Sequence, residues 1–288
     1  MKQEWKWIAL LLFATAIWGS TFALMKSLLS SLDTFALLAI RFSIAAALFG
    51  AYFAATKRKL AAAEIKHGAI LGLFMFAVFA AQVFGLNYTT ATNSGLITGL
   101  YVIFTPIISA LALRRLPERK VPIAAALSFA GLWLLTGASA NFNLGDAVTV
   151  LTAIAAALQI VFTSKYVQKS NPESLVLVQV ATVAVISSIV MLASGTVPKE
   201  VSADALFWLA FLAVFATIIA FLIMTKAQRV LDAPKAALVM VAEPVFAALF
   251  GFLILGELLS PVQMFGGLLI LGSVLLVESD FAVPALPE

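Results

Sequence analysis

The sequence predicts an all-α integral membrane protein whose ten transmembrane helices form two inverted five-helix repeats. Of its 288 residues, 63% are hydrophobic and only 11% are charged, whereas a soluble domain carries about 25% charged residues. The apolar segments run continuously instead of alternating with polar residues, which favours helices over the strands of a membrane barrel. A pair of neighbouring apolar segments also recurs later in the chain, which indicates a duplication.

Ten apolar segments, separated by short polar connections, are each expected to cross the membrane. A helix rises about 1.5 Å per residue, so about 20 residues span the hydrocarbon core. The segments lie at residues 7–28, 34–56, 66–86, 93–113, 121–139, 146–166, 173–194, 204–225, 234–256 and 261–278. The connections between them leave no room for a soluble domain.

The duplication is clearest when residues 93–135 are compared with residues 234–277. Matching positions lie 138 or 139 residues apart, namely Pro106 and Pro244, Glu118 and Glu257, and Pro122 and Pro261. Thr105 then aligns with Glu243, so the copies differ at the one residue that could titrate. The predicted units are a first repeat at 1–140, a second repeat at 141–280 and a short cytoplasmic tail at 281–288.

Lysine and arginine residues predict the orientation, because they accumulate on the cytoplasmic side of membrane proteins. With a cytoplasmic N-terminus, 15 of the 18 cations fall on the inner side, and only Lys26, Arg41 and Lys199 fall on the outer side. Both termini are therefore expected in the cytoplasm, and the protein is expected in the cytoplasmic (inner) membrane. Because five helices are an odd number, the two repeats would have opposite orientations, as in many secondary transporters.

Several function classes are disfavoured by the composition. The chain has no cysteine and one histidine, His67, which leaves too few ligands for a typical metal site and no thiol nucleophile. We therefore expect no enzyme, no cofactor and no metal, and nothing indicates a nucleic-acid partner. There is no glycine-rich nucleotide loop, so ATP is not expected to be the direct energy source. The first apolar segment has full span length and no small-residue cleavage site, so no cleavable signal peptide is expected.

Polar and charged side chains within the first two spans are candidate site residues. Trp18 lies about 11 residues beyond Trp7, roughly 16 Å along a helix axis, so its indole either lines a cavity or packs between helices. Lys26 lies near the outer end of the first span, where it could extend to the interface. Arg41 lies about seven residues into the second span, where an arginine must pair, face water or hold carbonyls. It either holds a substrate carboxylate or ties helix ends together, with Asp33 at best a distant partner.

Four further residues are predicted to bind substrate on similar grounds. Gln82 is informative because an unpaired amide in hydrocarbon costs several kcal/mol. Tyr101, together with Thr105, could point a hydroxyl group inward. Gln159 and Phe162 lie in the span that corresponds to the first span of the other repeat.

Glu243 is the sharpest candidate, because a carboxyl group in hydrocarbon costs about 3 kcal/mol or more and marks function by default. It could bind a proton in exchange for substrate, or stay neutral and hydrogen-bond to the backbone opened by Pro244. It could equally face the first-half helices and fix their distance. Pro106 and Pro244 are predicted to kink their helices and to serve as gating points.

Four short motifs resemble those of one family. They are WGSTFALMK at 18–26, LNYTTA at 86–91, AEPV at 242–245 and LGE at 255–257. Together they resemble the drug/metabolite transporter superfamily, in particular its EamA family. The resemblance extends over all ten spans and implies two inverted five-helix repeats that move small metabolites, often outward.

The sequence as a whole predicts a secondary transporter that exports amino acids or related metabolites by alternating access, with protons as a candidate coupling ion. Sugars, nucleobases and drug-like compounds stay open as alternative solutes, and a channel or a structural membrane subunit is the less favoured alternative. The expected partners are a small-molecule substrate and the lipid bilayer. Either a monomer or a homodimer agrees with the sequence.

Overall fold

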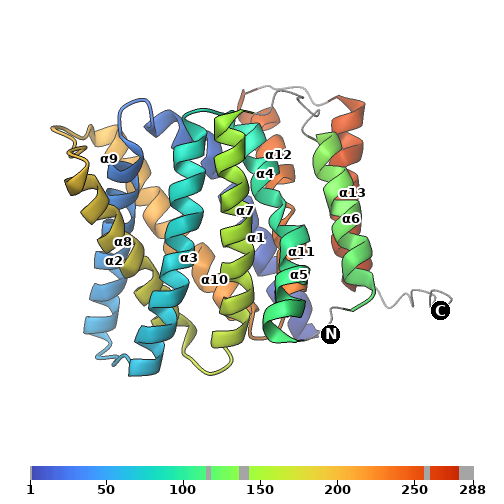
Figure 1. Cartoon of the computed structure of the whole chain (residues 1–288), viewed down its shortest axis with the longest axis horizontal. Helices are drawn as coiled ribbons and strands as arrows, with labels where there is room; N and C mark the ends of the chain where they lie inside the picture. The colour runs from blue at the N-terminus through green and yellow to red at the C-terminus, as the bar shows by residue number, and fades with distance from the viewer. Residues whose placement is uncertain (1, 115–117, 136–142, 256–259, 279–288) are drawn as a thin grey trace.

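The computed structural model describes residues 2–114, 118–135, 143–255 and 260–278, and this part of the chain is entirely helical (Figure 1). The elements are α1 (Lys2–Leu28), α2 (Thr34–Ala55), α3 (Ala62–Leu86), α4 (Ala91–Gly99), α5 (Tyr101–Leu113), α6 (Lys120–Leu135), α7 (Leu144–Tyr166), α8 (Pro172–Ala193), α9 (Ala203–Phe211), the π-helix η1 (Leu212–Ile219), α10 (Ala220–Ala227), α11 (Ala233–Met240), α12 (Glu243–Leu255) and α13 (Pro261–Glu278).

Six helical runs are long and apolar enough to cross a membrane: residues 4–28, 34–55, 62–86, 144–166, 172–193 and 203–227. Shorter apolar helices occupy 97–113, 120–134 and 261–276. Large apolar side chains such as Leu111, Leu192 and Leu268 are exposed on the outside of the bundle, as expected of a surface that meets lipid. The chain is therefore a multi-pass membrane protein.

Short polar side chains fix where the long helices begin. The Asp33 carboxylate accepts from the Phe35 backbone N–H at 2.8 Å and caps α2. Asn143 and Asp146 form a reciprocal capping box at the start of α7. Asn171 caps α8, whose first residue is Pro172. Each side chain satisfies a backbone donor that the first helical turn leaves without a partner.

Three of the ten predicted spans are divided into shorter helical elements in the structure. The segment at 93–113 divides into α4 and α5 around Leu100, and the segment at 234–256 divides into α11 and α12 around residues 241–242. The segment at 204–225 contains the π-helix η1 in its middle. The breaks at Leu100 and at residues 241–242 lie on the N-terminal side of Pro106 and Pro244, the two prolines that were predicted to kink these spans, whereas the π-helix was not predicted.

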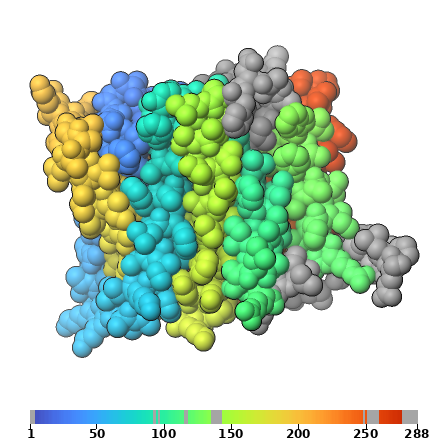
Figure 2. All heavy atoms as spheres, viewed as in Figure 1, coloured from blue at the N-terminus to red at the C-terminus, as the bar shows by residue number. Residues whose placement is uncertain are grey.

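The helices form one continuous bundle in which the two halves of the chain intermingle. α2 packs along α8, α3 packs against both α7 and α8, and α6 packs along α13. Figure 1 shows the α6–α13 pair at one end of the bundle and α2 with α8 at the other. On the face seen in Figure 2, α8, α3 and α7 lie side by side. α1 contacts α4, η1, α10, α11 and α12.

Glycines allow the closest helix crossings. A Cβ atom on Gly131 of α6 would lie 2.6 Å from the Gly266 carbonyl oxygen of α13. The same pair of helices is joined by the hydroxyl groups of Ser128 and Ser273, 2.6 Å apart. On α1, a Cβ atom on Gly19 would lie 2.8 Å from the carbonyl oxygen of Glu243. Small residues therefore set the distance between facing backbones, as is common in membrane bundles.

The end of the bundle at which α1 begins also carries most of the described cations, and we call it the basic end. Its cations lie after α2, at the end of α7, at the end of α10 and at the start of α11. Others lie at the start of α1, at the start of α3 and between α5 and α6. The described cations at the basic end include Lys6, Lys57, Arg58, Lys59, Lys66, Arg114, Arg119, Lys120, Lys165, Lys169, Lys226, Arg229 and Lys235. Residues 256–257 of the LGE motif and the predicted tail at 281–288 lie outside the described residues.

Candidate functional site: a cavity between the two halves of the chain

A small cavity lies inside the bundle and is bounded by residues from both halves of the chain. The space open to the centres of water-sized spheres is about 70 Å³, enough for several water molecules or a small solute, since one water needs about 10–15 Å³ on this measure. Its walls are Trp18, Thr21, Arg41, Val78, Phe79, Gln82, Thr98, Tyr101, Ala156, Gln159, Ile160, Phe221, Met224, Met240 and Glu243. A mostly apolar wall with a few convergent polar groups is typical of ligand sites.

Six of the seven residues predicted to bind substrate line this cavity, namely Trp18, Arg41, Gln82, Tyr101, Gln159 and Glu243. They come from α1, α2, α3, α5, α7 and α12. Phe162 does not belong to the cavity wall. Its ring packs against Phe74 of α3 at 5.5 Å and against Tyr166 at 5.8 Å. These ring contacts give Phe162 a packing role beside the cavity wall.

Trp18 has a specific partner deep in the bundle. Its indole Nε1 donates to the carbonyl oxygen of Ala216 in η1 at 2.9 Å. Its ring lies 5.1 Å from the ring of Phe221. The residue therefore both lines the cavity and joins α1 to the π-helix, so the two alternatives left open by the sequence coexist.

Arg41 is buried, with 1% of its surface exposed. Its Nε donates to the Thr217 hydroxyl at 3.0 Å, and Nη1 lies 3.5 Å from the sulfur of Met25. The guanidinium carbon lies 4.7 Å from the centre of the Phe79 ring and 5.2 Å from that of Phe42. No carboxylate of a described residue lies within ion-pair distance of it. Buried charges are ordinarily paired, so this cation faces the cavity with part of its hydrogen-bonding capacity unused.

The partners of Trp18 and Arg41 lie on the π-helix, which the sequence did not predict. Ala216 and Thr217 are consecutive residues of η1, and the Thr217 hydroxyl also donates to the Leu212 carbonyl at 2.9 Å. π-Helical turns occur frequently at functional sites. The only signal in the sequence was a lone threonine in an apolar run.

Tyr101 and Glu243 face the cavity near each other. The Tyr101 hydroxyl is buried and has no hydrogen-bond partner in the described part of the chain, and the carboxyl group of Glu243 is close enough to influence it electrostatically. Glu243 is half-buried, and its side chain makes no hydrogen bond or ion pair to a described residue. Thr105 points elsewhere, because its hydroxyl donates to the Tyr101 carbonyl of its own helix at 2.7 Å.

Two amides complete the polar wall. Gln82 donates to the Thr98 hydroxyl at 3.4 Å, which is a long hydrogen bond. Gln159 donates to the side-chain oxygen of Gln179 on α8 at 3.1 Å. Both amides are buried and line the cavity. A polar side chain is unfavourable in a wholly apolar interior, so these two amides mark a polar part of the cavity wall.

The remaining sequence candidates have structural surroundings. Lys26 does not only extend to the interface, because its ammonium group donates to the carbonyl oxygens of Leu86 and, at 3.0 Å, Thr89 at the end of α3. Pro106 lies inside α5, six residues after the break at Leu100. Pro244 is the second residue of α12, so it follows the break instead of kinking a continuous helix.

Among the described residues, no group of three or more acidic, histidine or cysteine side chains could hold a metal ion. The cavity instead presents one cation, one carboxyl group, one phenol and two amides within an aromatic and aliphatic wall. Such a set can bind a small solute that has charged and apolar parts.

Comparison with known proteins identifies the family of the chain. The EamA-like transporter family matches residues 5–137 and again residues 143–279. An uncharacterized transporter of Archaeoglobus fulgidus is 35% identical over 263 residues, which cover 91% of this chain and 82% of the relative. The uncharacterized transporter YwfM of Bacillus subtilis is 26% identical over 225 residues, covering 75% and 76%. A solved crystal structure with 20% identity superposes with a TM-score of 0.77 over 94% of this chain and 96% of its own, which supports the fold. The chain therefore belongs to the EamA-like transporter family.

Proposed function

We propose that the protein is a secondary transporter that exports amino acids or closely related metabolites across the cytoplasmic membrane by alternating access. The observation that carries the proposal is the buried guanidinium of Arg41, which faces the cavity without a carboxylate among the described residues. A substrate carboxylate would supply the missing charge partner through charge-assisted hydrogen bonds. Family membership supports transport as such, and the cavity supports the choice of solute.

Two other residues of the cavity wall, Glu243 and Tyr101, suit the ammonium end of an amino acid. Glu243 has no described partner, and the neighbouring Tyr101 hydroxyl lacks one as well. An ammonium group could donate to both, while the carboxylate binds Arg41. An apolar side chain would then contact the wall formed by Phe79, Phe221 and neighbouring methionines. A zwitterion with an apolar side chain fits this set better than a sugar, which would leave Arg41 without an ionic partner.

The repeat architecture supports the mechanism. The family matches the chain twice in succession, and helices of the first half pack on their counterparts in the second: α6 on α13 and α2 on α8. We propose ten crossings in two inverted halves, with the basic end and both termini in the cytoplasm. Rocking of one half against the other, bending at the breaks near Leu100 and 241–242, would expose the cavity to each side in turn.

Counterflow in proteoliposomes tests the proposal. We expect export-competent exchange with apolar amino acids and much weaker exchange with their amides, since an amide cannot pair with Arg41 as a carboxylate does. Arg41→Gln should remove the preference for acids over amides, whereas Arg119→Gln, at an exposed arginine, should keep it. Equal exchange of acids and amides by the unaltered protein would contradict the assignment of Arg41.

Proton coupling is tested separately. If Glu243 exchanges a proton for substrate, flux should depend on pH in the unaltered protein, and Glu243→Gln should abolish this dependence. Thr105, which aligns with Glu243 in the other repeat, offers a control through Thr105→Val. A Glu243→Gln variant whose flux keeps the original pH profile would contradict the proton role and leave substrate binding as the role of this carboxyl group.

A further inference from the structure

Buried polar side chains continue from the cavity toward the basic end, between α7, α8 and α10. We call them the polar seam: Gln159, Thr163, Gln179, Thr225 and Gln228. Gln159 belongs to the cavity wall. The other four have no exposed surface, although they lie in a protein whose interior is otherwise largely apolar.

Contacts connect the members of the polar seam. Gln159 donates to the side chain of Gln179 at 3.1 Å. Gln228, directly after α10, donates to the carbonyl oxygen of Ile160 at 2.9 Å. Thr163 lies one helical turn after Gln159, and Thr225 lies about one turn before Gln228, so each threonine shares a helix face with a connected glutamine. The polar seam therefore runs along the bundle axis from the cavity outward.

Four atoms of the polar seam are unsatisfied. The hydroxyl groups of Thr163 and Thr225, the side-chain nitrogen of Gln179 and the side-chain oxygen of Gln228 have no hydrogen-bond partner among the described residues. Burying such a group without a hydrogen-bond partner is unfavourable, because the group loses the water to which it would otherwise bond. Polar residues that serve only as contacts between membrane helices would be hydrogen-bonded to one another. Unpaired groups are instead expected where water or solute enters in another conformation of the protein.

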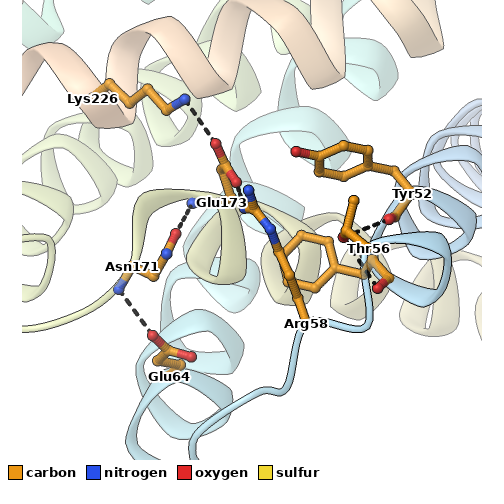
Figure 3. A network of polar contacts seen from close by, with 8 residues as sticks. Tyr52, Thr56, Arg58, Glu64, Asn171, Glu173 and Lys226 are labelled. Carbon is orange, nitrogen blue, oxygen red and sulfur yellow. Dashed lines mark hydrogen bonds and ion pairs between the residues drawn. The ribbon is translucent and has the colours of Figure 1, made fainter.

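Figure 3 shows a cluster of ion pairs at the basic end. One of its members, Lys226, directly follows Thr225 of the polar seam in α10. Glu173, near the start of α8, forms an ion pair with Arg58 after α2 and another with Lys226 of α10, the latter at 2.9 Å. Glu64 of α3 accepts from the Asn171 backbone at 3.0 Å beside them. This cluster joins α2, α3, α8 and α10 at the basic end, beside the last turn of α10, which carries Thr225. These ion pairs are only partly buried, and ion pairs near the surface are weak individually, so they can part and re-form.

We propose that the polar seam is the inner half of the solute path, closed in this structure by the Arg58–Glu173–Lys226 cluster. The inference rests on the proposed transport function and adds a location to it. When the cluster parts, water enters between α7, α8 and α10 and satisfies the four unpaired atoms. A polar solute then moves between the cavity and the cytoplasm along Gln159, Thr163 and Gln228.

The absence of cysteine from the sequence makes a direct test feasible. Single variants Thr163→Cys and Thr225→Cys place a thiol of similar size in the polar seam, on two different helices. A membrane-impermeant maleimide reacts with a thiolate, which requires water at the site. Inside-out vesicles present the cytoplasmic side to the reagent, and intact cells present the outer side.

Matched controls are Val161→Cys, equally buried on α7 but in the apolar core, and the exposed Lys169→Cys. We expect both seam variants to react in inside-out vesicles at least about tenfold faster than Val161→Cys. An open state that is populated at a few per cent exposes the seam far more often than local unfolding exposes the apolar core. Lys169→Cys should react fastest. The seam variants should not react in intact cells, and their reacted forms should lose counterflow.

The outcomes separate this inference from the proposed function. Seam cysteines as inert as Val161→Cys, in a preparation that performs counterflow, would overturn the location of the path and leave the transport function intact. Reaction only from the outer side would also overturn it. Rapid reaction from the cytoplasmic side in a protein that exchanges no solute would support a hydrated seam and contradict the transport function instead.

Discussion

Gly19→Ala probes the closest approach of α1 to the cavity. Gly19 follows Trp18 and faces the first turn of α12. A Cβ atom there would lie 2.8 Å from the Glu243 carbonyl oxygen, 2.9 Å from the Ala247 nitrogen and 3.0 Å from the Phe246 Cβ. Ordinary contacts begin at 3.4 Å, so the two helices must separate by about 0.6 Å. Two of the three atoms belong to the α12 backbone, which cannot rotate away as a flexible side chain would.

The size of the effect follows from two opposing terms. Overpacking of this kind costs about 1–3 kcal/mol, and replacing glycine with alanine inside a helix returns about 1 kcal/mol. The net loss relative to the unaltered protein is therefore about 0–2 kcal/mol, and the loss relative to a variant with only the favourable term is about 1–3 kcal/mol. Gly50→Ala on α2 is the matched control, because nothing lies within 4 Å of its added Cβ. That variant has only the favourable term and should be as stable as the unaltered protein or slightly more stable.

Both variants are heated in detergent, and the protein that stays monodisperse is then measured by size-exclusion chromatography. We expect Gly19→Ala to lose its monodisperse peak several degrees below Gly50→Ala. Its counterflow rate should also fall, because the displaced segment carries Glu243. A Gly19→Ala protein that is as stable as Gly50→Ala would refute the close packing of α1 on α12.

Three further outcomes are expected from the same stability assay. Trp18→Phe should cost about 1 kcal/mol, because the buried carbonyl of Ala216 loses its donor. Lys26→Met should cost about 1 kcal/mol, since the carbonyl oxygens at the end of α3 lose a cation, whereas Lys199→Met should be neutral. Equal stability of the two variants would contradict the contact of Lys26 with these carbonyl oxygens. Glu173→Gln should cost about 1 kcal/mol or less at low salt and nothing at high salt, because its partners are partly exposed; a loss that persists in high salt would argue against an electrostatic origin.

The ends of the long helices were predictable from the sequence because capping side chains mark them. The segments expected at 34–56 and 173–194 correspond to α2 at Thr34–Ala55 and α8 at Pro172–Ala193. The interruptions were not predictable in the same way. A π-helix has no composition of its own and is defined by its backbone hydrogen-bond pattern. Its contacts in this protein come from α1 and α2, which are distant in the chain.

Most of the cavity wall was accessible to reasoning because polar residues are rare in these spans. Arg41, Gln82 and Glu243 stand out against an apolar background, and each lines the cavity. Aromatic residues carry no such signal, since the chain has 23 phenylalanines. Phe221 lines the cavity and Phe162 does not. Identifying Phe221 instead of Phe162 would require knowing how each helix is rotated about its axis, and this rotation is fixed by packing.

The π-helix has a consequence for how the chain can be compared with its relatives. A π turn holds about one residue more than an α turn, and one residue corresponds to about 100° of rotation. Deleting a single residue from Leu212–Ile219 would convert this stretch into a regular α-helix. The change would rotate Ala216 and Thr217 away from the indole of Trp18 and the guanidinium of Arg41, to which they are hydrogen-bonded. A relative without the extra residue must therefore bind these two groups by other means, and an alignment gap of one position in this stretch would mark where such proteins diverge.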